Sequence, residues 1–286
     1  TFFDSNYAAQ GLSLYYSLKQ NAEENFSLYI LCLDDVLFNK LEAMKLSNVT
    51  LINLTQVESS YPELLLAKEN RSLIEYYFTL SPVLPLYILQ EFEEEVIASL
   101  DADILFFSSP TPIFEELGNQ SIYIVPHRFR EHQSHLAISG TFNVQCQLFR
   151  NDVIGIQCLN EWKQQCLEWC FDRYEDEKFA DQKYLDSWPK KYKTNLVISS
   201  NTGVGVAPWN VQNEKISRSN KEFYINNTKI VFYHFHGFKP FTRFFFKLGL
   251  STYQVSKSSA LMQMYKIYAK SLHAHQILSK RKSINR

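Results

Sequence analysis

The sequence predicts an α/β protein with a mixed, mostly parallel sheet flanked by helices and a C-terminal helical extension. Short apolar runs alternate with helical patterns from the N-terminus onward. Hydrophobic residues make up 45% of the 286 residues, enough to fill a sizeable core. No apolar run approaches the roughly 18 residues that a membrane-spanning helix needs. After Pro240 the pattern becomes helical and basic.

The order of the elements follows from these patterns. Expected strands, in chain order, are residues 2–3, 27–33, 48–54, 95–100, 121–125, 142–149 and 230–236. Expected helices are residues 6–19, 72–92, 152–171 and a shorter one starting within 181–188. Pro82 and Pro85 should bend or interrupt the second helix. Because no repeat or long linker is visible, we expect one catalytic domain over residues 1–240 and a basic, aromatic-rich extension over 241–286.

The five cysteines are odd in number and match no zinc pattern, which predicts buried free thiols in a reducing compartment. The charge is distributed unevenly. From Phe223 onward there are eleven Lys and Arg and no Asp or Glu, after eighteen basic and thirty acidic residues. The tail contains Phe244-Phe245-Phe246 and Lys280-Arg281-Lys282. Peripheral attachment to anionic lipid and a core-packing helix with a disordered basic end are both open. Nucleic-acid binding is not expected, because no nucleic-acid motif accompanies the charge.

Asp101-Ala102-Asp103 directly follows an apolar strand. Ligands bind beyond the carboxyl ends of strands in open α/β sheets, and two carboxylates there suit Mg²⁺ or Mn²⁺ holding a diphosphate. The structural alternative is a solvated acidic turn. A phosphatase of the haloacid dehalogenase type, with Asp101 as nucleophile, is another. Two observations count against it: the motif lies far from the N-terminus, and Leu105 stands where Thr or Val is usual.

A second polar cluster follows the strand expected at residues 230–236 and contains His234, His236, Gly237 and Lys239. An imidazole can complete a metal site begun by carboxylates. A glycine lets the backbone approach a phosphate, and a lysine supplies a cation for the diphosphate. For either histidine alone, a half-buried strand position is the commoner explanation; the compact cluster favours a site.

With these motifs the chain resembles GT-A nucleotide-sugar glycosyltransferases, similar to the glycogenin and galactosyltransferase group usually called family eight. It is also similar to bacterial proteins labelled nucleotide-diphospho-sugar transferases, from Phe2 to about Pro240. The resemblance implies a Rossmann-like GT-A fold. It implies that the strand ending at Phe3 runs into Asp4-Ser5-Asn6-Tyr7, which receives the nucleotide base. It also implies that Leu100-Asp101-Ala102-Asp103 binds the metal and the diphosphate.

The same resemblance assigns residues to the rest of the donor. It implies metal ligation by Asp101, Asp103 and His234, whose spacing to Gly237 favours it over His236, and diphosphate contacts from His236, Gly237 and Lys239. Asn143 is expected to face the donor sugar, with Asp181 and Gln182 as catalytic residues and Gln182 near the anomeric carbon. The alternative for Asp181 is a helix cap. Retention of anomeric configuration is implied as well.

The chain departs from the family at several positions. Gln145 replaces a glycine two residues after Asn143. Thr79 stands where the long helix usually has a basic residue, with Arg71 one or two turns earlier, and Phe241 replaces a tryptophan. Trp209 is expected either to stack on a sugar or to be buried. His127 and Arg128 are expected in a solvated loop, with contact to the acceptor as the alternative.

The sequence therefore predicts a metal-dependent transferase that moves a sugar from a nucleoside-diphosphate donor, a UDP-sugar by the resemblance, to an acceptor hydroxyl. The cofactor is expected to be Mn²⁺ or Mg²⁺, and the acceptor a bacterial glycan or glycolipid such as lipopolysaccharide. The location expected is the cytoplasm, with contact to the inner face of the membrane. The alternatives are a hydrolase and a non-catalytic nucleotide-sugar-binding module.

Overall fold

The computed structural model describes residues 1–22, 26–240 and 246–281, with side chains as far as residue 276. The chain forms two compact units. Unit 1 comprises Thr1–Asn53, Asp101–Ile113 and Asn201–Arg286, and unit 2 comprises Leu54–Leu100 and Phe114–Ser200. The boundary between a catalytic domain and an extension near Pro240 stays a prediction.

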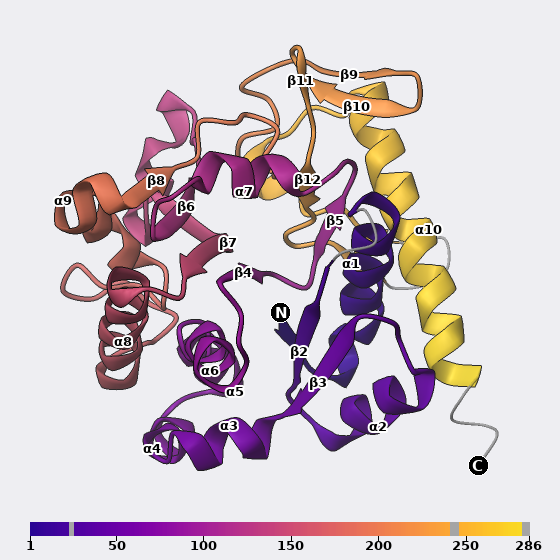
Figure 1. Cartoon of the computed structure of the whole chain (residues 1–286). Coiled ribbons are helices and arrows are strands. Elements are labelled where there is room, and N and C mark those ends of the chain that lie inside the picture. The colour runs from indigo at the N-terminus through magenta and orange to yellow at the C-terminus, as the bar shows by residue number, and fades with distance from the viewer. Residues whose placement is uncertain (23–25, 241–245, 282–286) are drawn as a thin grey trace. The chain divides into compact units, whose positions relative to one another are not determined.

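Unit 1 begins with three parallel strands in the order β1-β2-β3, connected through helices (Figure 1). These elements are β1 (Phe2–Phe3), η1 (Ser5–Tyr7), α1 (Ala8–Asn21), β2 (Leu28–Cys32), α2 (Asp35–Met44) and β3 (Val49–Asn53). Every residue of the central strand β2 is buried, as expected for a parallel strand covered on both faces. Asp34 caps α2 by accepting a hydrogen bond from the Leu37 N–H at 2.7 Å.

The later segments of unit 1 join this N-terminal part. Strand β5 (Ile104–Phe106) pairs antiparallel with β12 (Phe232–His234). The long helix α10 (Ser259–Arg281) lies along α1 (Figure 1). Its buried Tyr265 and Tyr268 pack into an aromatic core with Phe235. The other elements are β9 (Ile216–Ser219), β10 (Glu222–Ile225), β11 (Thr228–Lys229), β13 (Lys239–Pro240), β14 (Phe246–Lys247) and η5 (Ser251–Tyr253).

Unit 2 is built on a four-stranded sheet in the order β4-β7-β6-β8. The strands are β4 (Val96–Leu100), β6 (Ile122–Pro126), β7 (Phe142–Arg150) and β8 (Leu196–Ile198). Helices α6 and α8 pack on β4 and β7. The helices are α3 (Leu54–Ser60), α4 (Glu63–Asn70), α5 (Leu73–Thr79), α6 (Val83–Glu91), η2 (Glu131–Ser139), α8 (Val153–Glu168), η3 (Lys183–Ser187), α9 (Trp188–Tyr192) and η4 (Lys193–Asn195); α7 (Thr111–Leu117) begins in unit 1 and ends in unit 2.

The predicted α/β class is confirmed, but parallel pairing is less extensive than expected. Among the described strands it occurs in β1-β2-β3 and between β6 and β8, and the other ladders are antiparallel. Parallel neighbours require a crossover such as α1 or α2. Strands β6 and β7 are joined by η2 instead, and they pair antiparallel.

The predicted long helix over residues 72–92 is two helices, α5 and α6, as the prolines suggested. Pro82 is the N-cap of α6, whereas Pro85 lies in its first turn, where the backbone needs no N–H donor. After Pro240 the pattern was expected to become helical and basic. Instead Lys239–Pro240 pairs with Phe246–Lys247 as two short strands, and the helix starts only at Ser259.

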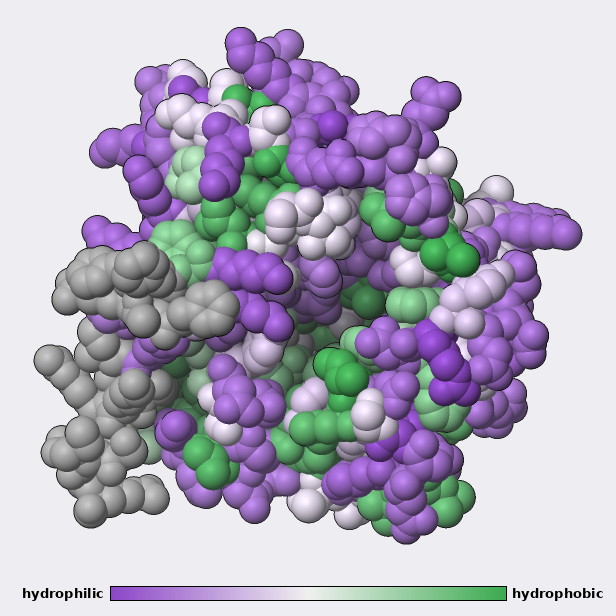
Figure 2. Space-filling view, turned by 180° about the vertical axis from the view of Figure 1, so that it is seen from behind, coloured by the Kyte–Doolittle hydropathy of each residue, from purple (hydrophilic) through white to green (hydrophobic). Residues whose placement is uncertain are grey.

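All five cysteines are free and buried, as predicted. Among the described helices, none combines the length and hydropathy that crossing a bilayer requires. Figure 2 shows hydrophilic residues over most of one face, with hydrophobic residues in smaller groups between them. Phe244, Phe245 and Lys282 lie outside the described residues, as does Phe241.

Candidate functional site

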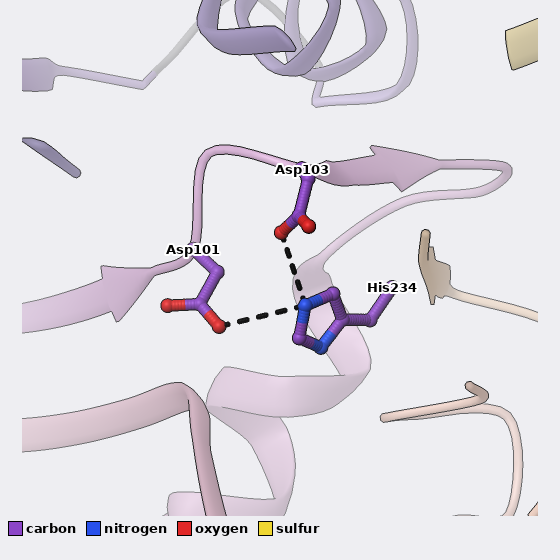
Figure 3. Close-up of side chains that lie close together, drawn as sticks. All are labelled: Asp101, Asp103 and His234. Atoms are coloured by element: carbon purple, nitrogen blue, oxygen red, sulfur yellow. Dashed lines mark ion pairs between the residues drawn. The ribbon is translucent and has the colours of Figure 1, made fainter. Parts of the chain in front are cut away.

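Asp101, Asp103 and His234 form a compact group in unit 1 (Figure 3). The two carboxylates come from the turn between β4 and β5, and the imidazole comes from the end of β12. His234 Nε2 lies 3.0 Å from Asp103 Oδ1 and 3.6 Å from Asp101 Oδ2. One ligand atom from each residue lies within 4.8 Å of the others. The structure thus brings together the three residues that were predicted to hold a metal.

Strand pairing explains why these residues meet. His234 lies opposite Ile104 in the β5–β12 ladder, and the Phe235 N–H donates to the Asp103 carbonyl oxygen at 3.0 Å. Trp209 is buried, and its ring packs edge-on against His234 at 5.3 Å between centroids. The buried alternative for Trp209 is therefore correct, and its ring supports the imidazole.

In the absence of an ion, His234 and Asp103 stabilise each other's charged forms. Burial lowers the pKa of His234, but the facing Asp103 carboxylate raises it, and the net pKa lies above the usual value. Burial raises the pKa of Asp103, whereas His234 and then His236 lower it, and the net pKa lies below the usual value. A divalent ion bound here would take the place of the proton on His234. It would compensate the charge of the two carboxylates as the protonated imidazole does.

The donor set fits a divalent metal of intermediate hardness. Two carboxylates are hard oxygen ligands, and a neutral imidazole is accepted by Mn²⁺ and similar ions. Asp101 is the most accessible of the three, with a side chain 36% exposed, while His234 is 4% exposed. A metal held here would have Asp101, Asp103 and His234 as its protein ligands.

The other residues of the late cluster lie beside the group. The His236 ring is 5.6 Å from the His234 ring, centroid to centroid, and is outside the set of three ligands. Gly237 has a left-handed backbone, with φ of 71°. Its neighbour is Gly249, where a Cβ would lie 2.5 Å from the His236 carbonyl oxygen. Gly249 was not among the residues predicted from the sequence, because no recognisable motif surrounds it. Lys239 is exposed in β13, and its contact with a diphosphate stays a prediction.

Asp4, Asn6 and Tyr7 are held together at the end of β1. Asp4 Oδ1 accepts hydrogen bonds from the Asn6 and Tyr7 N–H groups at 3.0 and 3.1 Å, and Asn6 Nδ2 donates to Asp4 Oδ2 at 3.2 Å. Partial burial and the carboxylates of Asp103 and Asp4 raise the pKa of Tyr7. Phe3 is buried in β1 against Gly11, where a Cβ would lie 2.1 Å from the Phe3 ring.

Asn143 and Gln182, also predicted from the sequence, are hydrogen-bonded to each other in unit 2. Asn143 Nδ2 donates to Gln182 Oε1 at 2.8 Å, and Gln182 Nε2 donates to the Ser139 carbonyl oxygen at 2.8 Å. The Gln145 N–H donates to Asn143 Oδ1 at 2.9 Å. Both amides therefore have defined orientations. Leu100 ends β4 in the same unit, and Ala102 is buried between the two aspartates of unit 1.

Asp181 is buried, and its ionised form is destabilised by the loss of hydration. Its Oδ2 atom has no hydrogen-bond partner among the described residues, and the side chain is nearly inaccessible. Burial raises the pKa of this carboxyl to about 6, against opposing hydrogen bonds from Ser81 and the backbone. The capping alternative is wrong, because η3 begins at Lys183 with Gln182 in the N-cap position.

Two further observations change the sequence interpretation of unit 2. Arg71 reaches the position expected to carry a basic side chain, because its guanidinium donates to the Thr79 hydroxyl. It also donates to the carbonyl oxygens of Cys166 and Leu167 at 2.6 Å each. His127 was expected in a solvated loop, but it is only 4% exposed, and its Nε2 lies 3.0 Å from Asn143 Nδ2.

Comparisons with known proteins give curated relatives over most of the chain. No protein-family model matches the chain. YfnD of Bacillus subtilis (strain 168), an uncharacterized protein, is 31% identical over 261 residues, which are 90% of this chain and 82% of YfnD. YfnF of the same organism, also uncharacterized, is 29% identical over 239 residues, covering 80% of this chain and 78% of YfnF.

Solved structures with a similar fold include glycosyltransferases. The galactosyltransferase LgtC, in complex with donor and acceptor sugar analogs, superimposes with a TM-score of 0.60 at 15% identity, over 96% of this chain and 94% of LgtC. Mouse xyloside xylosyltransferase 1 gives a TM-score of 0.51 at 14% identity, over 82% of this chain and 96% of its own. The chain therefore belongs to the same family as Bacillus subtilis YfnD, and its fold is that of the GT-A glycosyltransferases.

Proposed function

We propose that this protein transfers a sugar from a nucleoside-diphosphate donor to an acceptor hydroxyl, with Mn²⁺ or Mg²⁺ held by Asp101, Asp103 and His234. The observation that carries the proposal is the arrangement of these three side chains beside the paired strands β5 and β12, in a fold shared with glycosyltransferases. A bound metal would offset charge on the diphosphate as the sugar–phosphate bond breaks.

The roles of the other residues are proposed from the resemblance and supported by their contacts. Asp4, Asn6 and Tyr7 form a hydrogen-bonded turn suited to receive a base. Gly237 and Lys239 would contact the diphosphate, with His236 beside them.

Asp181 and Gln182 would act on the donor sugar, supported by Asn143. A buried carboxylate oxygen without a partner is suited to accept a hydrogen bond from a sugar hydroxyl, which would relieve its desolvation. A neutral amide such as Gln182 is a poor nucleophile and is better suited to stabilise an oxocarbenium-like state. Retention of anomeric configuration is part of this proposal and is read directly from the anomeric proton of the product.

The acceptor is proposed to be a bacterial glycan or glycolipid, approached from an anionic membrane surface. Helix α10 supports this contact: its described outward side chains include Lys266 and Lys270, and this part of the sequence contains no carboxylate. Salt-sensitive sedimentation with vesicles containing phosphatidylglycerol, absent with phosphatidylcholine alone, is the expected result. Equal sedimentation with both would contradict it.

A screen of nucleotide-sugar hydrolysis, with and without Mn²⁺, tests the proposal. One donor should be hydrolysed slowly with Mn²⁺, and Asp103→Asn should abolish the reaction. Glu42→Gln, which alters an exposed carboxylate on α2 in the same unit, is the matched control and should keep the activity. Release of phosphate from simple esters, insensitive to nucleotide sugars, would indicate the hydrolase instead. Donor binding without hydrolysis or transfer would indicate a binding module.

A further inference from the structure

We propose that His127 is a positioning residue that fixes the side chain of Gln182 through Asn143. The inference rests on the proposed function, because it assigns Gln182 a part in sugar transfer. All members of the network belong to unit 2. His127 directly follows β6, Asn143 lies in β7 opposite Val125, and Gln182 precedes η3.

Irregular strand pairing brings His127 and Asn143 to the same face. The register between β6 and β7 shifts after Ile124, so that Val125 lies opposite Asn143. The His127 N–H donates to the Thr141 carbonyl oxygen at 2.9 Å, which continues the ladder by one residue beyond the pair of Pro126 and Phe142. Side chains two residues apart on a strand point to the same face. His127 and Asn143 are therefore diagonal neighbours.

The hydrogen bonds allow a single orientation of each amide. Asn143 Oδ1 accepts from the Gln145 N–H, so Asn143 Nδ2 must be the atom that faces Gln182 and His127. Gln182 Nε2 donates to a carbonyl oxygen, so Gln182 Oε1 is the atom that accepts from Asn143. An amide nitrogen has two hydrogens and no acceptor capacity. Asn143 thus donates one hydrogen to Gln182 and the other to His127.

This assignment determines the chemical form of His127. Its Nε2 atom must be an unprotonated acceptor, so the ring is neutral and carries its proton on Nδ1. The ring is held in place by burial and by stacking on Phe129, with centroids 4.5 Å apart and planes 12° apart. A fixed acceptor beyond Asn143 prevents that amide from rotating. Gln182 consequently presents its side chain in one arrangement rather than several.

Two substitutions distinguish the contribution of the His127 acceptor atom from that of the ring's shape. His127→Phe keeps a flat ring against Phe129 but removes the acceptor. His127→Gln restores an acceptor oxygen at similar reach. We expect His127→Phe to lower kcat for the donor 10- to 100-fold with KM changed less than about 2-fold, because small misplacements of a reacting group have effects of this size. His127→Gln should recover most of kcat. His132→Phe, at an exposed position in η2, is the control and should behave as wild type.

The tautomer is measured independently of activity, from the ¹⁵N shifts and long-range proton couplings of the selectively labelled full chain. Unprotonated Nε2 and protonated Nδ1 are expected for His127. Protonated Nε2, an unchanged kcat in a folded His127→Phe variant, or a His127→Gln variant no better than His127→Phe would each overturn the inference. If the wild type turns over no donor, the proposed function fails, and so does the role of Gln182 in sugar transfer. The tautomer then still decides whether the hydrogen-bonded arrangement exists.

Discussion

His234 faces Asp103 at 3.0 Å because strand β12 pairs with β5 in a register that places His234 opposite Ile104. The carboxylate thereby compensates a buried imidazole, and both groups are positioned before any ion arrives. Removing one of them leaves the other buried without its partner, which is costly. This relationship determines how the site should respond to a metal.

Metal binding should raise the thermal stability of the wild type but not of Asp103→Asn. A ligand present at about 100 times its dissociation constant stabilises the folded state by roughly 2.7 kcal/mol, which corresponds to several degrees in Tm. The measurement is thermal unfolding with a Mn²⁺ titration at pH 7.5, followed by EDTA to reverse the shift. Glu42→Gln should shift like the wild type. An equal Mn²⁺ shift in Asp103→Asn would show that the ion binds elsewhere.

The buried carboxyl of Asp181 should make stability fall as pH rises. Burial raises its pKa to about 6 in the folded state, from 3.8 when exposed. Between these values the folded state binds more protons than the unfolded state, so the free energy of unfolding decreases with increasing pH. Asp181→Asn should therefore match the wild type below about pH 4 and exceed it by up to about 3 kcal/mol above pH 6.

Urea unfolding at a series of pH values measures this difference. Asp172→Asn, at an exposed position in the same unit, should give a difference independent of pH. A wild type that is as stable as Asp181→Asn at pH 7 would mean that the carboxylate is satisfied in the folded protein. If the stabilised Asp181→Asn variant also loses donor turnover, the charge is retained for function rather than for folding.

Gly140 should be required for the placement of Gln182. A Cβ at this position would lie 3.2 Å from Gln182 Cγ and 3.3 Å from its Nε2, and the backbone φ is 130°. Gly140→Ala should lower kcat for the donor on the order of 10-fold by displacing the amide. Gly118→Ala is the control, because Gly118 also has a positive φ but its Cβ would meet only a backbone oxygen at 3.9 Å. Equal losses of kcat in both variants would mean that backbone strain, and not displacement of Gln182, causes the effect.

Replacing Arg71 with lysine should destabilise the protein. Its guanidinium donates to three acceptors, the Thr79 hydroxyl and two carbonyl oxygens at the end of α8. A lysine ammonium lacks the planar fork that reaches all three, so Arg71→Lys should lower the free energy of unfolding by roughly 1 to 3 kcal/mol. Arg173→Lys alters an arginine with a side chain 54% exposed and should change stability by less than about 0.5 kcal/mol. Chemical unfolding compares the two, and similar losses would contradict a special role for Arg71.

Much of the fold was predictable because its signals are local. The apolar runs at β2, β3, β4 and β7 and the helical pattern of α1 are properties of neighbouring residues, and all occur close to where they were expected. The position of Asp101 and Asp103 directly after an apolar run is likewise a local fact. Some segments were not predicted, such as the paired strands β13 and β14. They are short, and their pairing depends on residues that are not adjacent.

The sequence by itself determined which residues of this protein have suitable chemistry, and the tertiary structure decided which of them meet. Asp103 and His234 are joined only by the pairing of β5 with β12, and Asn143 and Gln182 only by the folding of unit 2. His127 was assigned to solvent, because an exposed and a buried histidine after a strand have the same local sequence. Its burial depends on the register of β6 with β7, and register is a property of two strands rather than of one.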